Sequence, residues 1–132
     1  MSTRKIEALV DGIANFHRWH EPESDAYQLK NPLLIKSFAR PGKHVIDPEG
    51  RRVFPSKLDG YKAALFDMDL KVHGNSRAGL RPDDLLINLL RVYGLSEPAG
   101  QEMVVTFLRK VFKDVTINKQ TPLSYFQNEV IE

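Results

Sequence analysis

The chain has 132 residues, of which 42% are hydrophobic and 27% charged, and its formal net charge at pH 7 is +2. This length and composition are typical of one globular domain that can bury a core without disulfides or a structural metal. The chain contains no cysteine, which excludes a disulfide framework and a thiolate metal site, and its small charge argues against a nucleic-acid-binding protein, which usually has a concentrated basic face.

The N-terminal segment MSTRKIEALVDGIANF interleaves Lys, Glu and Asp with its apolar residues. It lacks the continuous apolar run of a secretory signal peptide. The sequence also contains no apolar run long enough to cross a bilayer. We therefore expect a cytoplasmic protein that has no membrane partner.

The first predicted helix extends from Thr3 to Arg18. Ser2 or Thr3 can cap its start, and its apolar residues have the spacing of one buried helical face: Ile6, Leu9, Val10, Ile13 and Phe16. Pro22 disfavours helical angles at the residue before it, so the helix should end at or before His20. The polar segment that follows is therefore placed at a helix end, where it can face a cleft.

A small β-rich region is predicted next. Residues 33–38, LLIKSF, mix β-capable side chains and are expected to form a short strand. Pro41-Gly42 and Asp47-Pro48-Glu49-Gly50 are turn signals around the short runs HVI and RRVF. This alternation is typical of a small antiparallel hairpin or sheet.

The second helix is predicted to begin after Ser56 and to end at Gly74. Gly60 is unfavourable inside a helix, so its presence suggests a close contact with another backbone. Pro82-Asp83-Asp84 is expected to open a third helix that stops at Gly94, because proline suits the first helical position and carboxylates suit the positive end of the helix dipole.

The fourth helix is predicted over residues 98–113. The following tail is expected to pack back onto the core through Leu123, Tyr125 and Phe126. Together these elements describe an α+β, mainly α domain with four to five helices and a small antiparallel β-hairpin or sheet between the first two long helices. The whole chain, residues 1–132, is predicted to form this single domain.

The segment 13–34, IANFHRWHEPESDAYQLKNPLL, resembles the lysozyme-like, soluble lytic transglycosylase-like domains of phage and bacterial cell-wall proteins. In that family the first helix ends in aromatic-Glu-Gly-aromatic, and a short loop leads to Asn-Asn-Pro-Gly-Asn-Leu. Phe16-His17-Arg18-Trp19 stands at the first pattern, and Asn31-Pro32-Leu33-Leu34 keeps only Asn-Pro of the second. Because the family's catalytic Glu precedes Asn-Pro by roughly fourteen residues, its position here is that of His17.

Later segments extend the resemblance over most of the chain. Val53-Phe54 and the run DGYKAAL at residues 59–65 resemble the family's Phe and its "eGw-Al" segment. The end of the chain, LRKVFKDVTINKQTPLSYF, resembles the closing helix and the "d-TPLs" tail. The resemblance implies a lysozyme-like fold. Without a leader, we expect the chain to reach a cell wall only by lysis, in a phage particle or after removal of a leader.

The residue at the acid position is the main departure from the family. Glycosidic cleavage needs a carboxylic acid that protonates the leaving oxygen and then, as an anion, stabilises an oxocarbenium-like centre. A protonated His17 could donate a proton, but it would start positive beside a developing positive charge. Glu21, Glu23 and Asp25 are candidate surrogate acids, although loop carboxylates are usually solvated surface groups.

A metal site is a second possible use of this segment. His17, His20 and Glu21 resemble a ligand cluster, but their spacing differs from the helical His-Glu-x-x-His of zinc proteases. Helix-end histidines that bond to backbone or solvent are the commoner case. We expect no metal and no cofactor.

Candidate substrate-binding residues follow from chemistry and from the resemblance. Trp19 and Tyr27 could stack on sugar rings, although aromatic side chains near a helix end often belong to the core or its rim. The resemblance implies a place on the cleft floor for Asn31, which could equally be a helix cap or a turn residue. Phe54 and Tyr93, like Tyr61, match aromatic positions of the family, whereas helical periodicity assigns them to the core.

Six basic residues surround the predicted hairpin: Lys36, Arg40, Lys43, His44, Arg51 and Arg52. They would bind an anionic polymer if they were functional, but such a stretch is more often solvated. Three hypotheses follow: a non-catalytic lysozyme-like domain that binds peptidoglycan-type glycan, an active lytic transglycosylase or muramidase with a displaced carboxylate, and a fold reused to bind a protein or anionic polymer. The sequence predicts no oligomeric state.

Overall fold

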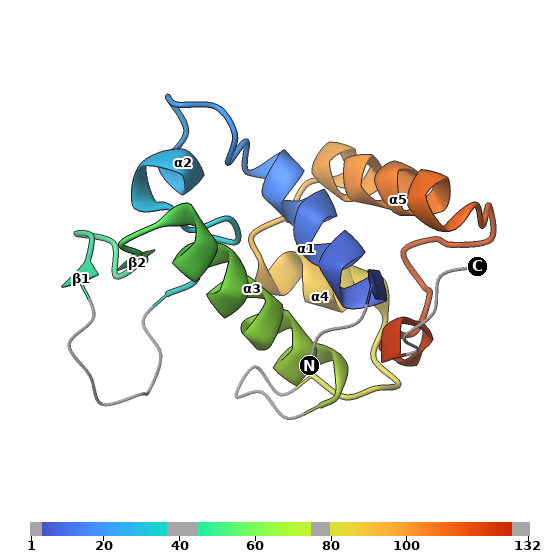
Figure 1. Ribbon diagram of the computed structural model, residues 1–132. Helices are drawn as coiled ribbons and strands as arrows, with labels where there is room; N and C mark the ends of the chain where they lie inside the picture. The colour runs from blue at the N-terminus through green and yellow to red at the C-terminus, as the bar shows by residue number, and fades with distance from the viewer. Residues whose placement is uncertain (1–3, 37–44, 75–79, 128–132) are drawn as a thin grey trace.

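The computed structural model describes residues 4–36, 45–74 and 80–127. The described part is mainly helical, as predicted, and contains in order α1 (Arg4–Phe16), α2 (Asp25–Leu29), β1 (Val45–Ile46), β2 (Arg52–Val53), α3 (Lys57–Val72), α4 (Leu86–Val92), α5 (Pro98–Phe112) and the 3₁₀ helix η1 (Leu123–Gln127). Figure 1 shows α1 between α3 and α5, with the β-strands at the end of the molecule near α2.

The core forms around α1, whose predicted apolar face is confirmed. Ile6, Leu9 and Ile13 are fully buried, and they belong to one hydrophobic cluster with residues of α3, α4, α5 and η1. Each such side chain removed from water contributes about 1.5–3 kcal/mol to folding. The predicted packing of the tail is also confirmed, because Leu123 and Phe126 are completely buried.

The end of α1 and the loop after it differ from the prediction. The helix ends at Phe16 rather than at Arg18, because Arg18 takes left-handed backbone angles with φ 57°. The loop then forms α2, a short helix that was not predicted. Ser24 caps it by accepting a hydrogen bond from the Tyr27 amide, and this capping preference of serine was the local signal for a helix start.

The predicted strand at residues 33–38 is wrong in its described part. Leu34 lies in the left-handed region with φ 53°, and Lys36 makes only an isolated antiparallel bridge to Arg51. The predicted hairpin is present as two strands of two residues each, with Val45 opposite Val53. The turn at residues 41–42 and residues 37–38 lie outside the described residues.

The predicted capping of α3 is confirmed at both ends. Ser56 accepts a hydrogen bond from the Asp59 amide at 3.1 Å, and Gly74 follows the helix with φ 77°. The close contact predicted at Gly60 is also confirmed, since an added Cβ would lie 1.7 Å from the carbonyl oxygen of Lys30. Only glycine allows the end of α2 to approach α3 this closely.

The third predicted helix begins later than expected. The prediction of a start at Pro82 is wrong, because residues 82–84 form a turn and α4 starts at Leu86. The Asp84 carboxylate accepts a hydrogen bond from the Arg81 amide at 2.7 Å, and residue 85 pairs with the tail at residue 122. These contacts compete with helix formation. The last predicted helix, α5, is present and ends one residue early, at Phe112.

Candidate functional site

His17, which the resemblance aligns with the family's acid, follows α1 directly and faces the start of the α4–α5 connection. Its Nε2 atom lies 3.0 Å from the Tyr93 carbonyl oxygen, and its ring contacts Phe16 edge to face. Burial lowers the pKa of His17, and the hydrogen bond to Tyr93 offsets this only in part. Because a carbonyl can only accept, Nε2 carries the proton, and the imidazole is neutral at pH 7.

The candidate surrogate acids lie on the surface of the turn that follows α1. Glu21 and Glu23 are exposed, and Glu21 lies 3.5 Å from the guanidinium of Arg18. The Asp25 carboxylate is paired with Arg51 at 3.0 Å. In the part of the chain that the structure describes, no hydrogen bond or ion pair joins any of these carboxylates to His17.

Four side chains from α2, α3 and the turn after α1 form a surface group that we call the aromatic–lysine cluster: Trp19, Tyr27, Lys57 and Tyr61. Trp19 is only 8% exposed and stacks on Tyr61 with ring centroids 5.9 Å apart. The Tyr61 hydroxyl donates to Asp11 at 2.8 Å. The Lys57 ammonium lies 4.5 Å from the Tyr27 ring and 5.7 Å from the Trp19 ring, a distance typical of cation–π contacts.

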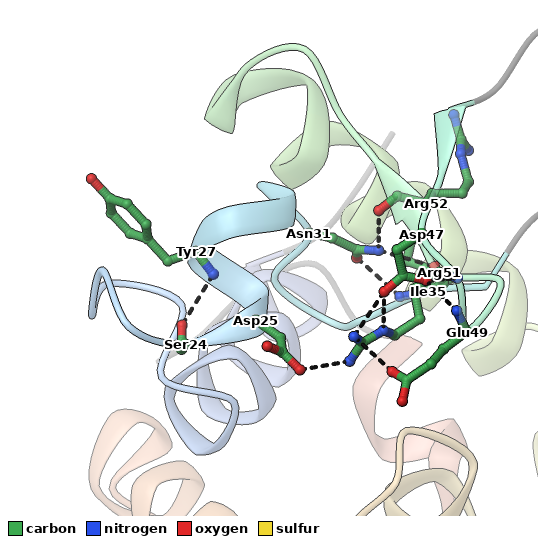
Figure 2. Close-up of polar contacts among 9 residues, drawn as sticks. All are labelled: Ser24, Asp25, Tyr27, Asn31, Ile35, Asp47, Glu49, Arg51 and Arg52. Carbon is green, nitrogen blue, oxygen red and sulfur yellow. Dashed lines mark hydrogen bonds and ion pairs between the residues drawn. The ribbon is translucent and has the colours of Figure 1, made fainter.

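The hydrogen bonds of Ser24 hold this cluster to the end of α1. Besides capping α2, its hydroxyl donates to the Arg18 carbonyl at 2.6 Å. The ring of Tyr27 projects from α2 away from the polar contacts beside it (Figure 2). One face of the cluster is thus directed outward, while Trp19 anchors it to the core.

Asn31 follows α2 and is completely buried. Its side-chain nitrogen donates to the Ile35 carbonyl at 2.9 Å and to the Arg52 carbonyl at 3.0 Å, and its oxygen accepts from the Ile35 amide at 2.9 Å. Figure 2 shows this amide between the loop and β2. Because both amide hydrogens are used within the chain, Asn31 acts as an internal brace in this structure.

Arg51 lies at the hairpin turn and is surrounded by three carboxylates (Figure 2). Its guanidinium lies 3.0 Å from Asp25, 2.8 Å from Asp47 and 2.7 Å from Glu49. Burial would raise the pKa of Asp47, but its hydrogen bonds with Arg51 lower the pKa overall. Arg51 therefore ties the hairpin to α2, and its charge is already balanced by acidic side chains.

The other basic residues near the hairpin have different surroundings. The Arg52 guanidinium lies over the Phe54 ring at 4.5 Å, and Lys36 is exposed. The remaining three, Arg40, Lys43 and His44, lie outside the described residues. Of the described members of this stretch, Arg51 is the one whose charge the carboxylates above balance.

Phe54 and Tyr93 occupy core positions, being 5% and 6% exposed. The Tyr93 hydroxyl donates to the Asp67 carboxylate at 2.5 Å, and Lys71 donates to the same oxygen at 2.6 Å. Burial and the Asp67 charge raise the pKa of Tyr93 well above its usual value. The sequence offered a local signal for the Asp67–Lys71 pair in its spacing of four on one helix.

Of the residues predicted for a site, Trp19 and Tyr27 are brought together, whereas His17, Asn31, Phe54 and Tyr93 are held by contacts inside the domain. Lys57 was missed, because its contact with α2 spans thirty residues and leaves no local pattern.

The described ranges also bear on metal binding and membrane insertion. Within them, no three His, Asp or Glu side chains converge in a way that could hold a metal ion. No helix in the same ranges is long and apolar enough to span a membrane. The chain matches no family model, no curated protein and no solved structure. The candidate site is therefore defined by its own residues.

Proposed function

We propose that this chain is a lysozyme-like domain that binds peptidoglycan-type glycan without cleaving it. The observation that carries the proposal is the imidazole of His17, at the position that the resemblance aligns with the family's catalytic acid. A neutral imidazole stands there, with its Nε2 hydrogen directed at the Tyr93 carbonyl, and Glu21 and Glu23 are exposed on the turn outside it. This arrangement lacks the buried, protonated carboxylic acid that glycoside cleavage requires.

The aromatic–lysine cluster supports a glycan as the ligand. Sugar rings have apolar C–H faces that pack on aromatic rings and hydroxyl rims that need polar partners. Tyr27 presents a half-buried ring beside the Lys57 ammonium, and the same ammonium lies 5.7 Å from the Trp19 ring. This combination of a ring and a polar group suits a sugar better than a purely apolar ligand.

Lytic activity is tested by incubating the purified protein with peptidoglycan and analysing the products. We expect neither anhydro-muropeptides nor new reducing ends. If products form and then disappear in Glu21→Gln or Glu23→Gln, the chain is instead an active lytic transglycosylase or muramidase with a displaced carboxylate. An inactive Glu23→Gln with active Glu21→Gln would identify Glu23 as that acid.

Binding is tested with insoluble peptidoglycan in a pull-down assay and with muropeptides in a fluorescence titration. Trp19 is the single tryptophan of the chain, and its stacking on Tyr61 places the reporter in the cluster. We expect a saturable change that Tyr27→Ala weakens. Absence of both the change and the pull-down would contradict a glycan role and favour a protein or anionic-polymer partner.

A His17→Glu variant examines the rest of the proposed cleft. The new carboxyl would be partly buried, like the imidazole, and would face the Tyr93 carbonyl, so its pKa should be raised and its acid form should donate to that oxygen. Lytic products from this variant, with none from wild type, would support a cleft that lacks only its acid.

A further inference from the structure

Lys57 differs from Arg18 and Arg51 in having aromatic rather than acidic neighbours. Arg18 lies beside Glu21, and Arg51 lies among three carboxylates. Lys57 contacts the rings of Tyr27 and Trp19, and among the described residues it forms no ion pair. Its exposed ammonium therefore keeps donors available for a ligand.

The nearby acidic groups are engaged elsewhere. The Asp25 carboxylate is bound by Arg51 at 3.0 Å. The Asp59 carboxylate accepts the hydroxyl of Ser56 at 2.8 Å. The positive charge of Lys57 is thus held in place by ring faces while the neighbouring carboxylates are bonded to other groups.

We propose that Lys57 binds a carboxylate of a glycan whose sugar stacks on Tyr27, so that the domain prefers acidic muramyl glycan to neutral chitin-type glycan. This inference rests on the proposed function and assigns a specificity-determining residue to it. A muramyl residue differs from N-acetylglucosamine by its lactyl group, which carries either a free carboxylate or an acidic stem peptide. The ammonium lies over one face of the Tyr27 ring, 4.5 Å from its centroid, so a sugar stacked on the opposite face would direct its carboxylate past the ring edge to the ammonium.

The experiment compares three probes by calorimetry or Trp19 fluorescence: chitohexaose, a muramyl oligosaccharide with free lactyl carboxylates, and the same oligosaccharide with stem peptides. Wild type is expected to bind the acidic probes more tightly than chitohexaose by roughly threefold to fivefold at low salt, as for an exposed ion pair. High salt should reduce this preference. The two acidic probes distinguish a lactyl carboxylate from a stem-peptide carboxylate as the group recognised.

Variants of two lysines on α3 separate a local contact from general electrostatics. Lys57→Gln should abolish the preference by lowering the affinity for the acidic probes more than the affinity for chitohexaose, and Lys57→Arg should keep the preference. Lys62→Gln removes the same charge from an exposed position of the same helix and should leave the preference intact. Unchanged melting temperatures would verify that all three variants fold.

Two results overturn the inference while leaving the proposed function standing. One is equal binding of all probes by wild type. The other is an equal loss of preference in Lys57→Gln and Lys62→Gln, which would assign it to net charge. If wild type binds none of the probes and no peptidoglycan, the proposed function itself fails, and the role of Lys57 fails with it.

Discussion

Replacing Gly60 with alanine tests how α2 is held against α3. A Cβ at this position would lie 1.7 Å from the Lys30 carbonyl oxygen, whereas real Cβ atoms essentially never approach another heavy atom within 3.0 Å. The obstacle is backbone, which cannot rotate away as a side chain can. In a close-packed interior the two helices would have to separate by more than about 1 Å.

The expected loss of stability follows from the hydrogen bonds beside Lys30. Asn31 makes three side-chain hydrogen bonds, two of them buried and one partly buried, and the Phe54 amide donates to the Leu29 carbonyl at 2.9 Å. At about 1 kcal/mol for each bond, their disruption costs about 4 kcal/mol. The helix propensity of alanine offsets about 1 kcal/mol. We expect Gly60→Ala to lower the free energy of unfolding by about 3 kcal/mol and Tm by on the order of 10 °C.

Urea and thermal unfolding followed by circular dichroism would measure this change. Gly12→Ala is the matched control, because it places the same methyl group inside α1 but against side chains, with Phe107 at 3.1 Å and Val104 at 3.3 Å. Those side chains can shift by a few tenths of an ångström, so the control should change stability by less than about 1 kcal/mol. Equal unfolding free energies for the two alanine variants would refute the backbone contact between α2 and α3.

Three further predictions concern stability. Burial lowers the pKa of His17 below 6.5, so the unfolded state binds more protons than the folded state. Stability should therefore be full above about pH 7 and should fall as the pH drops through 6.5. In urea titrations, His17→Gln should reduce this loss, whereas the exposed control His20→Gln should not. Asn31→Ala leaves buried partners unpaired and should cost about 2–3 kcal/mol in chemical denaturation; a loss below about 1 kcal/mol would contradict the bracing role. Lys113 ends α5 in the left-handed region, with φ 52°, which glycine adopts without strain. Lys113→Gly should therefore raise the free energy of unfolding by up to about 1 kcal/mol. Lys110→Gly, inside the helix, should lower it by a similar amount.

Much of the helical framework could be predicted from local sequence. The spacing of apolar residues identified the buried face of α1, and Ser56 and Gly74 identified the ends of α3. These features are local because a cap or an apolar face depends on residues within one or two helical turns. The glycine at position 60 also predicted a backbone contact, although the sequence did not identify its partner.

The failures occurred where hydrogen bonds, strand pairing or backbone angles overrode the pattern of apolar residues and prolines. The apolar run at residues 33–38 suggested a strand, but the side chain of Asn31 bonds to Ile35 and holds the described part as a loop. Pro82 suggested a helix start, but residue 85 pairs with the tail at residue 122. The left-handed angles of Arg18 ended α1 early. Of these three causes only the pairing of residue 85 with residue 122 lies beyond a local window. The other two are a side-chain hydrogen bond and a backbone angle, which the spacing of apolar residues does not reveal.

The sequence by itself determined a mainly helical chain with an amphipathic first helix, and it placed a histidine where the resembled family has its acid. Only the tertiary structure decided the surroundings of that histidine, because Tyr93, which accepts its hydrogen bond, is seventy-six positions away. The contact of Lys57 with Tyr27 likewise joins two helices. Periodicity fixes which face of a helix is buried, whereas the partner of a polar group depends on which segments the fold brings together.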